Sequence, residues 1–428
     1  MGLTYTTATA PGACKAGKRL GPARSDGGMG EQGAGWQTIH WARRPFLPGE
    51  EVHLKLSTAN LRTVLYSAHL DAGARVVPFG GWDMPLQYAG ILAEVKAVRT
   101  AMGIFDASHM GRLYVSGPRA TEMLDWVLTA SAASLRVGRA RYGMICNEAG
   151  GIIDDTIFYR LSDDRYLLIP NAGNRTKVAA WLQSWTDARF PGGCTVEDRT
   201  GTTALIAVQG PDTPAIMDQL CVLKSGQMPS SLRPFHWDEG SLQGTPIFTG
   251  RTGYTGEDGF EIVVEAAGAE AAWRSLLDRG AAPCGLGARD VLRLEAGLLL
   301  HGNEIDENTT PIEAGLKRFV SFDKEYSGAG ILRRQHEAGV DRKLVGLRLP
   351  GRSAPRPGYP ILDQGREIGR ITSGSYSPTL DTSIAMGYVL VRYAAPDQEL
   401  DLDIRGRIAR AQVVPLPFYT RPRRSQTK

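Results

Sequence analysis

Apolar and polar residues alternate in two different ways along the chain, and the pattern changes near residue 341. Before that point, helical and strand-like segments follow one another. Residues 86–102 predict an amphipathic helix that ends at Gly103. Its apolar face consists of Ile91, Leu92, Val95 and Val98. Residues 112–116 predict a short strand, which leads through Gly117-Pro118 into a second helix.

A sequence pattern occurs twice in this first region. The segment Val115-Ser-Gly-Pro is echoed by Val208-Gln-Gly-Pro, and each is followed by a helical run. Residues 166–173, followed by a helix with Trp181, are echoed by residues 260–268, followed by a helix with Trp273. Both copies predict strand, helix, hairpin, strand, helix, which is typical of helices packed on an antiparallel sheet. We therefore expect an α+β body made of two duplicated halves.

From about Asp341 the chain consists of short alternating strands separated by turn residues. The predicted strands are residues 344–349, 359–362, 368–371, 385–391, 400–404 and 409–414. Such a series indicates a small all-β barrel or sandwich. The expected organisation is a body over 61–322, a linker with a short helical run over 323–340, and a C-terminal β-barrel domain over 341–420.

The first sixty residues differ from the rest because they are rich in glycine and show no periodicity. Residues 1–60 are interpreted as a disordered extension, a start site placed too early, or a transit peptide. The last alternative would place the protein in the mitochondrial matrix, whereas the others fit a bacterial cytoplasmic protein.

Net charge, cysteine spacing and the length of apolar runs argue against several classes of protein. The formal charge is only +4, and the basic cluster Arg421–Arg424 is interpreted as a solvated end rather than a nucleic-acid site. Five scattered cysteines without a Cys-x-x-Cys pair argue against a disulfide framework or structural zinc and favour a reducing compartment. No apolar run approaches the roughly 20 residues that cross a bilayer. No cluster has the spacing of metal ligands, so no metal is expected.

Two glycine-rich segments with carboxylates, Asn147–Asp155 and Gly250–Glu261, carry the candidate chemistry. If the duplicated halves pack about a pseudo-twofold axis, these segments occupy roughly equivalent places and can face one cleft, which is a common place for a ligand. Asp154 and Asp155 could both be solvated turn residues. If they lie on a strand, only one of them faces the cleft, because neighbouring strand residues point to opposite faces.

Strand alternation also predicts which side chains accompany Asp155. Ile157 and Tyr159 share its face, and Ile169 and Asn171 share a face of the next strand. Ordinary core packing is the alternative for both isoleucines, and a helix N-cap is the alternative for Asn171.

The remaining candidates have simpler alternatives of their own. Glu261 could be an exposed strand residue and Arg289 a partner in a surface ion pair, while Met84 could be a core residue. Glu257 and Asp258 are interpreted as turn residues. His109 is interpreted as architectural, because no neighbouring serine or cysteine forms a nucleophile motif.

Seven sequence blocks, which include these two glycine-rich segments and follow one another in the order expected for one family, carry a resemblance. They are Val77-Pro-Phe-Gly-Gly-Trp-Asp-Met-Pro-Leu-Gln-Tyr88, Phe105-Asp-Ala-Ser-His-Met-Gly111, Asn147–Asp155, Tyr166–Gly173, Gly250–Glu261, Gly287–Gly297 and Ile371–Leu380. Together they resemble the aminomethyltransferase of the glycine cleavage system, its folate-dependent T-protein, from about Leu61 to Tyr419. The resemblance implies transfer of a methylene group from an aminomethylated lipoyl carrier, the H-protein, to tetrahydrofolate, with release of ammonia.

The resemblance also implies roles for individual residues. Asp155 corresponds to the acid at the reaction centre, and Glu261 to the acceptor of the pterin N3–H and amino group. Arg289 would contact the folate or hold Glu261, and Tyr254 would stack on the ligand or hydrogen-bond to it. The other positions that match folate contacts are Met84, Tyr142, Ile157, Tyr159, Ile169 and Asn171. No ligand role is carried over to Tyr419, where the match is loose.

Two alternatives remain open within folate chemistry. One is a non-catalytic folate-binding protein of iron–sulfur maintenance, although Lys324-Glu-Tyr-Ser-Gly328 lacks the cysteine of that group's motif. The other is a one-carbon transferase that uses a different amine donor. The folate half of a flavin oxidoreductase is disfavoured, because sixty glycine-rich residues cannot supply the dinucleotide-binding fold upstream.

Overall fold

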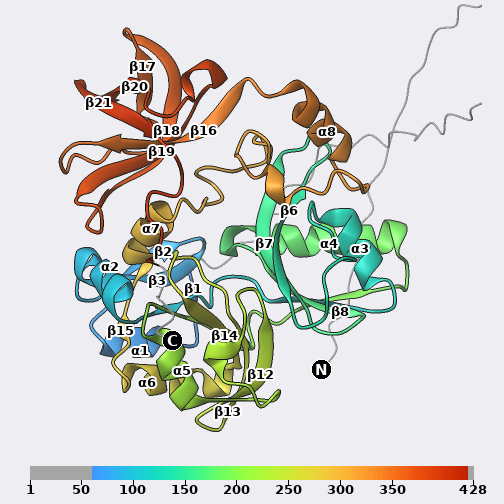
Figure 1. Cartoon of the computed structure of the whole chain (residues 1–428). Helices are drawn as coiled ribbons and strands as arrows, with labels where there is room; N and C mark the ends of the chain where they lie inside the picture. Colours follow the sequence, from blue (N-terminus) through green and yellow to red (C-terminus); the bar gives the residue numbers. More distant parts are fainter. Residues whose placement is uncertain (1–59, 423–428) are drawn as a thin grey trace, which may run out of the picture. The chain divides into compact units, whose positions relative to one another are not determined.

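The computed structural model describes residues 60–422 (Figure 1). The extension predicted for residues 1–60 and the end of the basic tail lie almost entirely outside the described residues, so these interpretations stay predictions.

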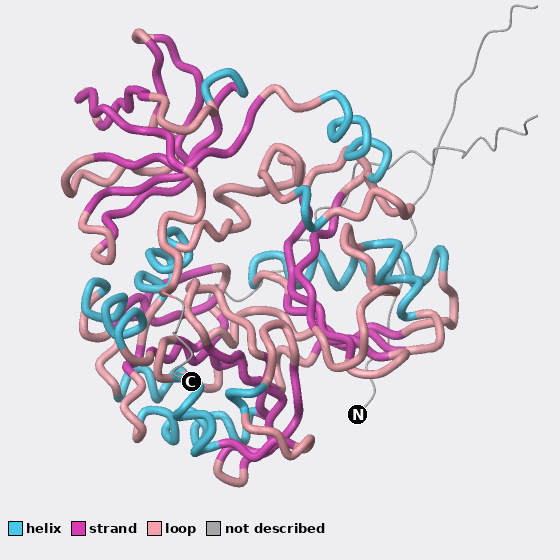
Figure 2. The backbone as a smooth tube through the Cα atoms, viewed as in Figure 1, coloured by secondary structure: helices cyan, strands magenta, loops and turns pink. Residues whose placement is uncertain are grey.

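The first half of the body is a five-stranded antiparallel sheet in the order β6-β7-β8-β5-β9. Its strands are β5 (Leu113–Ser116), β6 (Ala140–Cys146), β7 (Ile152–Arg160), β8 (Arg165–Ile169) and β9 (Thr195–Asp198). Helices α3 (Ala120–Val127) and α4 (Arg175–Arg189) lie along it (Figures 1 and 2). Met123, Leu124 and Leu182 of these helices pack on Leu113 and Phe158 of the sheet in one buried apolar cluster.

The second half is a seven-stranded sheet in the order β11-β12-β13-β14-β10-β4-β15. Its strands are β4 (Gly103–Asp106), β10 (Thr203–Gln209), β11 (Cys221–Leu223), β12 (Trp237–Leu242), β13 (Thr245–Gly250), β14 (Gly259–Glu265) and β15 (Ala282–Pro283). Helices α5 (Thr213–Leu220) and α6 (Ala269–Leu277) pack on it through Met217 and Trp273. All pairs are antiparallel except β15 with β4.

The predicted duplication is confirmed by the order of the strands. Each half contains a two-stranded hairpin that pairs with a third strand. That third strand pairs in turn with the strand that precedes the Gly-Pro turn. The resulting order is β6-β7-β8-β5 in the first half and, in the second, β12-β13-β14-β10. Asp155 lies on β7, whereas Glu261 lies on β14, the counterpart of β8. The two carboxylates therefore occupy different positions in their halves, which differs from the roughly equivalent places that the repeat suggests.

The predicted helix over residues 86–102 is wrong in its first part. Trp82–Gln87 forms strand β3, which pairs with β1 (Leu61–Arg62) and β2 (Arg75–Phe79); helix α1 (Tyr66–Asp71) lies between β1 and β2 in the chain. Helix α2 begins only at Ile91 and ends at Thr100, and Leu92 is exposed rather than on the buried face. Gly90, at φ 104°, separates strand from helix, and the buried carboxylate of Glu94 accepts the backbone N–H groups of Tyr88 and Gly90.

The C-terminal region forms a closed six-stranded barrel, as the alternation predicts. Its strands are β16 (Arg342–Leu349), β17 (Pro360–Asp363), β18 (Arg366–Ser377), β19 (Thr382–Leu390), β20 (Glu399–Ile404) and β21 (Arg407–Val414). Pairing of β21 with β16 closes it. Helix α8 (Ala329–Ala338) precedes the barrel, and helix α7 (Leu286–Glu295) of the body contacts β18 and β19.

Candidate active site

A cavity of about 730 Å³ is lined by both halves of the body and by α7. β7 and β8 contribute from the first half, β14 and the loop before it from the second. Eight of the ten residues predicted from the sequence line it: Tyr142, Asp155, Ile157, Ile169, Asn171, Tyr254, Glu261 and Arg289.

The Asp155 carboxylate is held by two neutral donors at the cavity wall. The Tyr142 hydroxyl donates to Oδ2 over 2.9 Å, and the Asn171 side-chain amide donates to Oδ1 over 2.8 Å. Burial raises the pKa of Asp155, although these two hydrogen bonds act in the opposite direction. A carboxyl group with a raised pKa can hold and release a proton closer to neutral pH, which suits acid–base chemistry.

Asp154 points the other way and is fully buried, so neither aspartate is a solvated turn residue. Its carboxylate accepts three hydrogen bonds, from the Asn171 backbone N–H (2.9 Å), the Asn171 side chain (2.8 Å) and the Asn174 side chain (2.7 Å). Burial, and then the neighbouring Asp155 charge, raise the pKa of Asp154. Asn171 makes no N-cap bond with its side chain; its amide instead bridges the two aspartates.

Glu261 is nine-tenths buried and is oriented from behind by a short chain of hydroxyls. Thr252 Oγ1 donates to Glu261 Oε2 over 2.6 Å and lies 2.7 Å from the Tyr159 hydroxyl. Glycine is required at position 250, because a Cβ there would lie 2.7 Å from the Tyr159 ring. Thr252 engages Oε2, and because Glu261 lines the cavity, its carboxylate can also accept hydrogen bonds from a ligand.

Tyr159 and Met84 do not line the cavity. Tyr159 is 2% exposed, and its hydroxyl lies 2.7 Å from Thr252 Oγ1, which donates to Glu261. Met84 is fully buried on β3, and its neighbour across the β2–β3 pair, Val77, lines the cavity instead. In the described structure both residues therefore support the cavity wall without forming it.

Arg289 brings a cation into the cavity from α7. Its guanidinium carbon lies 4.7 Å above the centre of the Tyr254 ring, and the Tyr254 hydroxyl donates to the Leu299 carbonyl over 2.5 Å. Within residues 60–422 no carboxylate forms an ion pair with Arg289, which excludes the surface ion pair considered from the sequence. Burial lowers the pKa of Arg289. A half-buried guanidinium without an ion-pair partner in the described structure favours a ligand that offers carbonyl oxygens or negative charge.

His109 lines the same cavity, although the sequence suggests only an architectural role. It is 2% exposed, and its Nδ1 has no hydrogen-bond partner in the described structure. Burial, followed by the positive charge of Arg289, lowers the pKa of His109 to about 3, so the ring is neutral at physiological pH. The signal in the sequence is its place in the block Phe105–Gly111, three residues after the last residue of β4.

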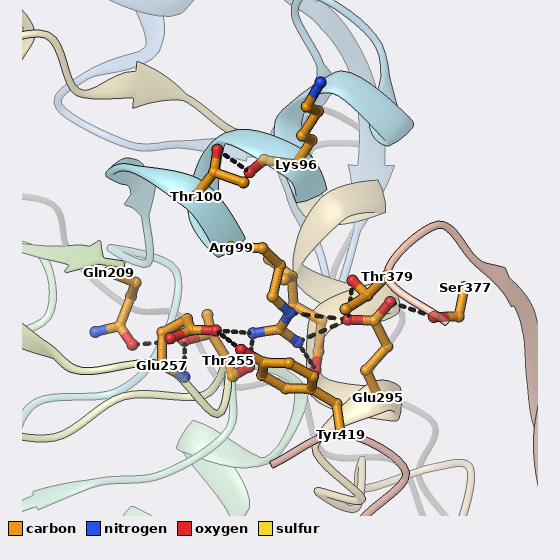
Figure 3. Close-up of polar contacts among 11 residues, drawn as sticks. Lys96, Arg99, Thr100, Gln209, Thr255, Glu257, Glu295, Ser377, Thr379 and Tyr419 are labelled. Atoms are coloured by element: carbon orange, nitrogen blue, oxygen red, sulfur yellow. Dashed lines mark hydrogen bonds and ion pairs between the residues drawn. The ribbon is translucent and has the colours of Figure 1, made fainter. Parts of the chain in front are cut away.

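The loop that carries Tyr254 is fixed at its base by a buried ionic network (Figure 3). Arg99 of α2 donates to the Thr255 carbonyl over 2.8 Å and to Glu257 over 3.0 Å. The same guanidinium forms a 2.7 Å ion pair with Glu295, at the end of α7. Glu257, interpreted from the sequence as a turn residue, is therefore a partner in this network.

The C-terminal region completes the network (Figure 3). Ser377 and Thr379 donate to the Glu295 carboxylate over 2.5 and 2.9 Å. The Tyr419 ring lies 4.1 Å from the Arg99 guanidinium carbon, and its hydroxyl donates to Glu257 over 2.7 Å. The network thus ties the Tyr254 loop to α2, α7 and the segment that follows the barrel.

Comparison with known proteins places these features in one family. Residues 65–324 match the GCVT N-terminal domain, and residues 342–420 match the glycine cleavage T-protein C-terminal barrel domain. The aminomethyltransferase of Symbiobacterium thermophilum is 44% identical over 371 residues, which cover 85% of this chain and 98% of that protein. The aminomethyltransferase of Saccharopolyspora erythraea is 47% identical over 367 residues, covering 84% and 98%.

A solved structure agrees with the sequence matches. The crystal structure of the glycine cleavage system aminomethyltransferase T from Bartonella henselae superposes with a TM-score of 0.78 at 38% identity. The superposition covers 84% of this chain and 98% of the Bartonella henselae protein. Within residues 60–422 no group of three or more His, Cys, Asp or Glu side chains is arranged to hold a metal ion, and none of the helices is long and apolar enough to span a membrane.

Proposed function

Because the chain belongs to the glycine cleavage T-protein family and is an aminomethyltransferase of that system, we propose that its cavity binds tetrahydrofolate as co-substrate. The observation that supports this most is the convergence of Asp155, Glu261 and Arg289 on one cavity of about 730 Å³. Such a volume suits a molecule of this size, and its mixture of apolar walls and a few polar groups is typical of small-molecule sites.

The reaction defines what the cavity must do. The aminomethyl carbon, bound to a lipoyl sulfur and to an amino nitrogen, leaves both atoms and becomes the bridge between N5 and N10 of the folate. Two N–H protons of the folate balance the equation, because ammonia and a lipoyl thiol are released. A group beside N5 and N10 must therefore pass protons and stabilise a cationic iminium carbon.

Asp155 is our candidate for this group. Its pKa is raised by burial, and Tyr142 and Asn171 fix both of its oxygens. When ionised it would stabilise the iminium cation, and when protonated it would return the proton to the leaving nitrogen or sulfur. The Asn171 amide lies between the two adjacent aspartates, since it also donates to Asp154.

Glu261 is our candidate for recognition of the pterin edge. A carboxylate can accept the pterin N3–H and the adjacent amino group with its two oxygens. Thr252 donates to Oε2 and helps to orient the carboxylate, whose oxygens would accept from the pterin edge. Arg289, stacked on Tyr254, would supply a donor for carbonyl or carboxylate oxygens of the same ligand.

The remaining candidates form the walls. Tyr142, Ile157 and Ile169 line the cavity beside Asp155, and we assign them to apolar and edge contacts with the folate. Met84 and Tyr159, which lie behind the lining, would act through their neighbours. No metal enters this scheme.

We further propose that the amine donor is the lipoylated H-protein of the glycine cleavage system. The relatives reported above are bacterial, which supports the bacterial cytoplasm as the site of action. Four described cysteines are buried and free, and this is consistent with a reducing compartment.

The proposal is tested by mixing the purified chain with aminomethylated H-protein, with and without tetrahydrofolate. We expect ammonia and methylenetetrahydrofolate to form in equal amounts, and only when folate is present. Folate binding without turnover would contradict the choice of donor and return the non-catalytic folate-binding alternative, which the relatives' names do not favour.

A further inference from the structure

Within residues 60–422 two histidines line the cavity, His109 and His301, and they lie in different environments. His109 is 2% exposed, and burial, followed by the positive charge of Arg289, lowers its pKa to about 3. Its ring therefore stays neutral over the pH range in which proton transfer is useful. His301 is half-buried and belongs to the segment that follows α7, and it lines the cavity together with Asp155.

The His301 ring is anchored to the strand that carries Asp155. Its Nε2 lies 3.1 Å from the carbonyl oxygen of Ile152, the first residue of β7, and Asp155 follows three residues later. A carbonyl oxygen can only accept a hydrogen bond, so Nε2 carries the hydrogen and the neutral ring has its lone pair on Nδ1. Nδ1 is thus the atom at which His301 can take up a proton.

The backbone around His301 is fixed without the help of its side chain. The Gly302 N–H donates to the Ile305 carbonyl over 2.8 Å, and the Leu300 N–H donates to the buried Glu304 carboxylate over 3.0 Å. We therefore expect the segment to keep its place when the imidazole is replaced, which makes side-chain variants informative.

His301 also acts on Asp155 electrostatically. Burial raises the pKa of Asp155, while the Tyr142 hydrogen bond and then the positive charge of His301 act in the opposite direction. Burial raises the pKa values of the nearby Tyr142 and Tyr254 hydroxyls, so both keep their protons, and Asp154 faces away from the cavity. The other charged side chains of the lining are Glu261, Arg289, Asp290, Arg293 and Arg318.

The proposed reaction moves two protons in each turnover. The folate loses the hydrogens of N5 and N10, while the amino nitrogen and the lipoyl sulfur each gain one. A single carboxylate must take up and release protons in turn. Two groups in opposite protonation states can take one proton and give another in the same step.

We propose that His301 is a second acid–base residue of the transfer reaction and works with Asp155 in the opposite protonation state. The inference rests on the proposed binding of tetrahydrofolate in this cavity. As the first folate nitrogen bonds to the aminomethyl carbon, the Asp155 carboxylate takes its proton. The His301 imidazolium gives its Nδ1 proton to the atom whose bond to that carbon breaks.

The second half of the reaction restores both groups. As the second folate nitrogen bonds to the carbon, His301 takes its proton, and Asp155 gives up the proton that it holds to the second leaving atom. Two C–N bonds to the folate form, one C–N and one C–S bond break, and each electron pair of a broken bond stays on the leaving nitrogen or sulfur. Both side chains end as they began.

The substitution His301→Gln removes the titrating ring but keeps an amide that can donate to the Ile152 carbonyl. We expect kcat with aminomethylated H-protein to fall by roughly a hundredfold. The affinity for tetrahydrofolate, measured by direct titration, and the melting temperature should stay close to wild type. In His301→Ala, added imidazole should raise the residual turnover by roughly tenfold, because it can occupy the vacated space and exchange protons.

His336→Gln is the matched control. His336 lies exposed on α8, where its ring stacks on Phe322 with 4.3 Å between the ring centres. This variant should turn over like the wild type, and imidazole should affect neither of them.

Chemical modification gives a readout that does not depend on activity. Diethyl pyrocarbonate attacks the unprotonated nitrogen of an imidazole. Mass spectrometry should find His301 carbethoxylated in the folate-free chain at pH 7, and bound tetrahydrofolate should protect it. His109, which is 2% exposed, should react far more slowly. An unmodified His301 in the folate-free chain would overturn the inference, since Nδ1 would then be closed to the cavity.

The kinetic outcomes separate this inference from the proposed function. If the wild type turns over and His301→Gln turns over equally fast, only the role of His301 is lost. A fall in melting temperature in parallel with kcat, or no rescue by imidazole, would also overturn it, because His301 would then support the cavity wall. If the wild type forms no methylenetetrahydrofolate, the proposed function fails and the inference fails with it.

Discussion

Asp154 and Asp155 are adjacent in the sequence, yet they lie in different environments. Asp154 is fully buried and accepts three hydrogen bonds from two asparagines. Asp155 faces the cavity with two neutral donors. Strand alternation alone predicts opposite directions for the pair. The asparagine pocket around Asp154 depends on tertiary structure and has no signal in the sequence.

The first prediction concerns Asp155→Asn. The amide has the same shape as the carboxylic acid but can neither take up a proton nor balance a cation. We expect turnover with H-protein and tetrahydrofolate to fall by roughly a hundredfold or more, because acid–base groups contribute that much. The melting temperature and the affinity for folate should stay close to wild type. Near-normal turnover would remove Asp155 from the chemistry.

Asp154→Asn is the control next to it. In either orientation of the new amide its NH₂ group would face a donor, either the side-chain amides of Asn171 and Asn174 or the Asn171 backbone N–H. A buried donor facing donors costs about 1–3 kcal/mol. We therefore expect this variant to lose stability first, the reverse of the Asp155 variant. Equal behaviour of the two variants would contradict the different roles assigned here.

His109 gives a prediction about pH. Its folded pKa of about 3 is below the ordinary value of 6.5, so its contribution to stability is complete above pH 6.5 and is lost as the pH falls towards 3. Between pH 7 and 5 the unfolded chain takes up a proton that the folded chain does not. This difference is worth about 2 kcal/mol at pH 5.

The measurement is urea unfolding of wild type and His109→Gln at pH 7 and 5. Asp106 and Arg112 also surround the ring, but their contributions cancel in the comparison of the two proteins. The variant should lose less stability than wild type on acidification. Identical losses would show that folding does not lower the pKa of His109.

The local sequence pattern is sufficient to predict the barrel strands. It is not sufficient where pairing with a distant strand decides between helix and strand. The six barrel strands follow from alternation along the chain. The start of α2 was placed too early, because Trp82–Gln87 has an apolar pattern that either a helix or a strand satisfies, and pairing with β2 decides for the strand. Eight lining residues were found, whereas Met84 and Tyr159 lie one layer behind.

The network around Arg99 belongs to the same class of unpredictable contacts. Arg99 and Glu295 are 196 residues apart in the sequence, and both are nearly inaccessible to solvent. Elements α2, α7 and the Tyr254 loop are joined through this one guanidinium (Figure 3). We infer that this network holds the loop with Tyr254 in place at the cavity wall.

We predict that Arg99→Met destabilises the chain by about 3–5 kcal/mol, because Glu257 and Glu295 would remain as buried charges without their cation. Urea unfolding measures this. Arg119→Met is the control, since Arg119 pairs with Glu122 at the surface and should cost less than about 1 kcal/mol. Similar small losses for both would show that the network carries little stability.

For the molecule as a whole, two duplicated halves and a barrel meet around α7. Arg289 of this helix faces the cavity, while Arg293, one turn later, pairs with the buried Glu304 over 2.8 Å and donates to Ser373 of β18 over 2.7 Å. Arg293 also lines the cavity, so two residues one turn apart on the same face of α7 connect the cavity to the barrel.

A deletion tests whether the described region suffices. Within the described residues, the buried apolar clusters extend from Leu65 to Phe418. Removal of residues 1–58 should therefore leave melting temperature and turnover unchanged. Insoluble or inactive protein would show that the removed residues contribute to the fold.

The most direct test of the account is a crystal structure of the chain with tetrahydrofolate bound. We expect the folate in the cavity between the two halves, with the pterin edge on Glu261 and with N5 and N10 beside Asp155. Folate bound elsewhere on the chain, or bound with Asp155 and Glu261 out of contact, would contradict the central claim that the two halves form one folate site.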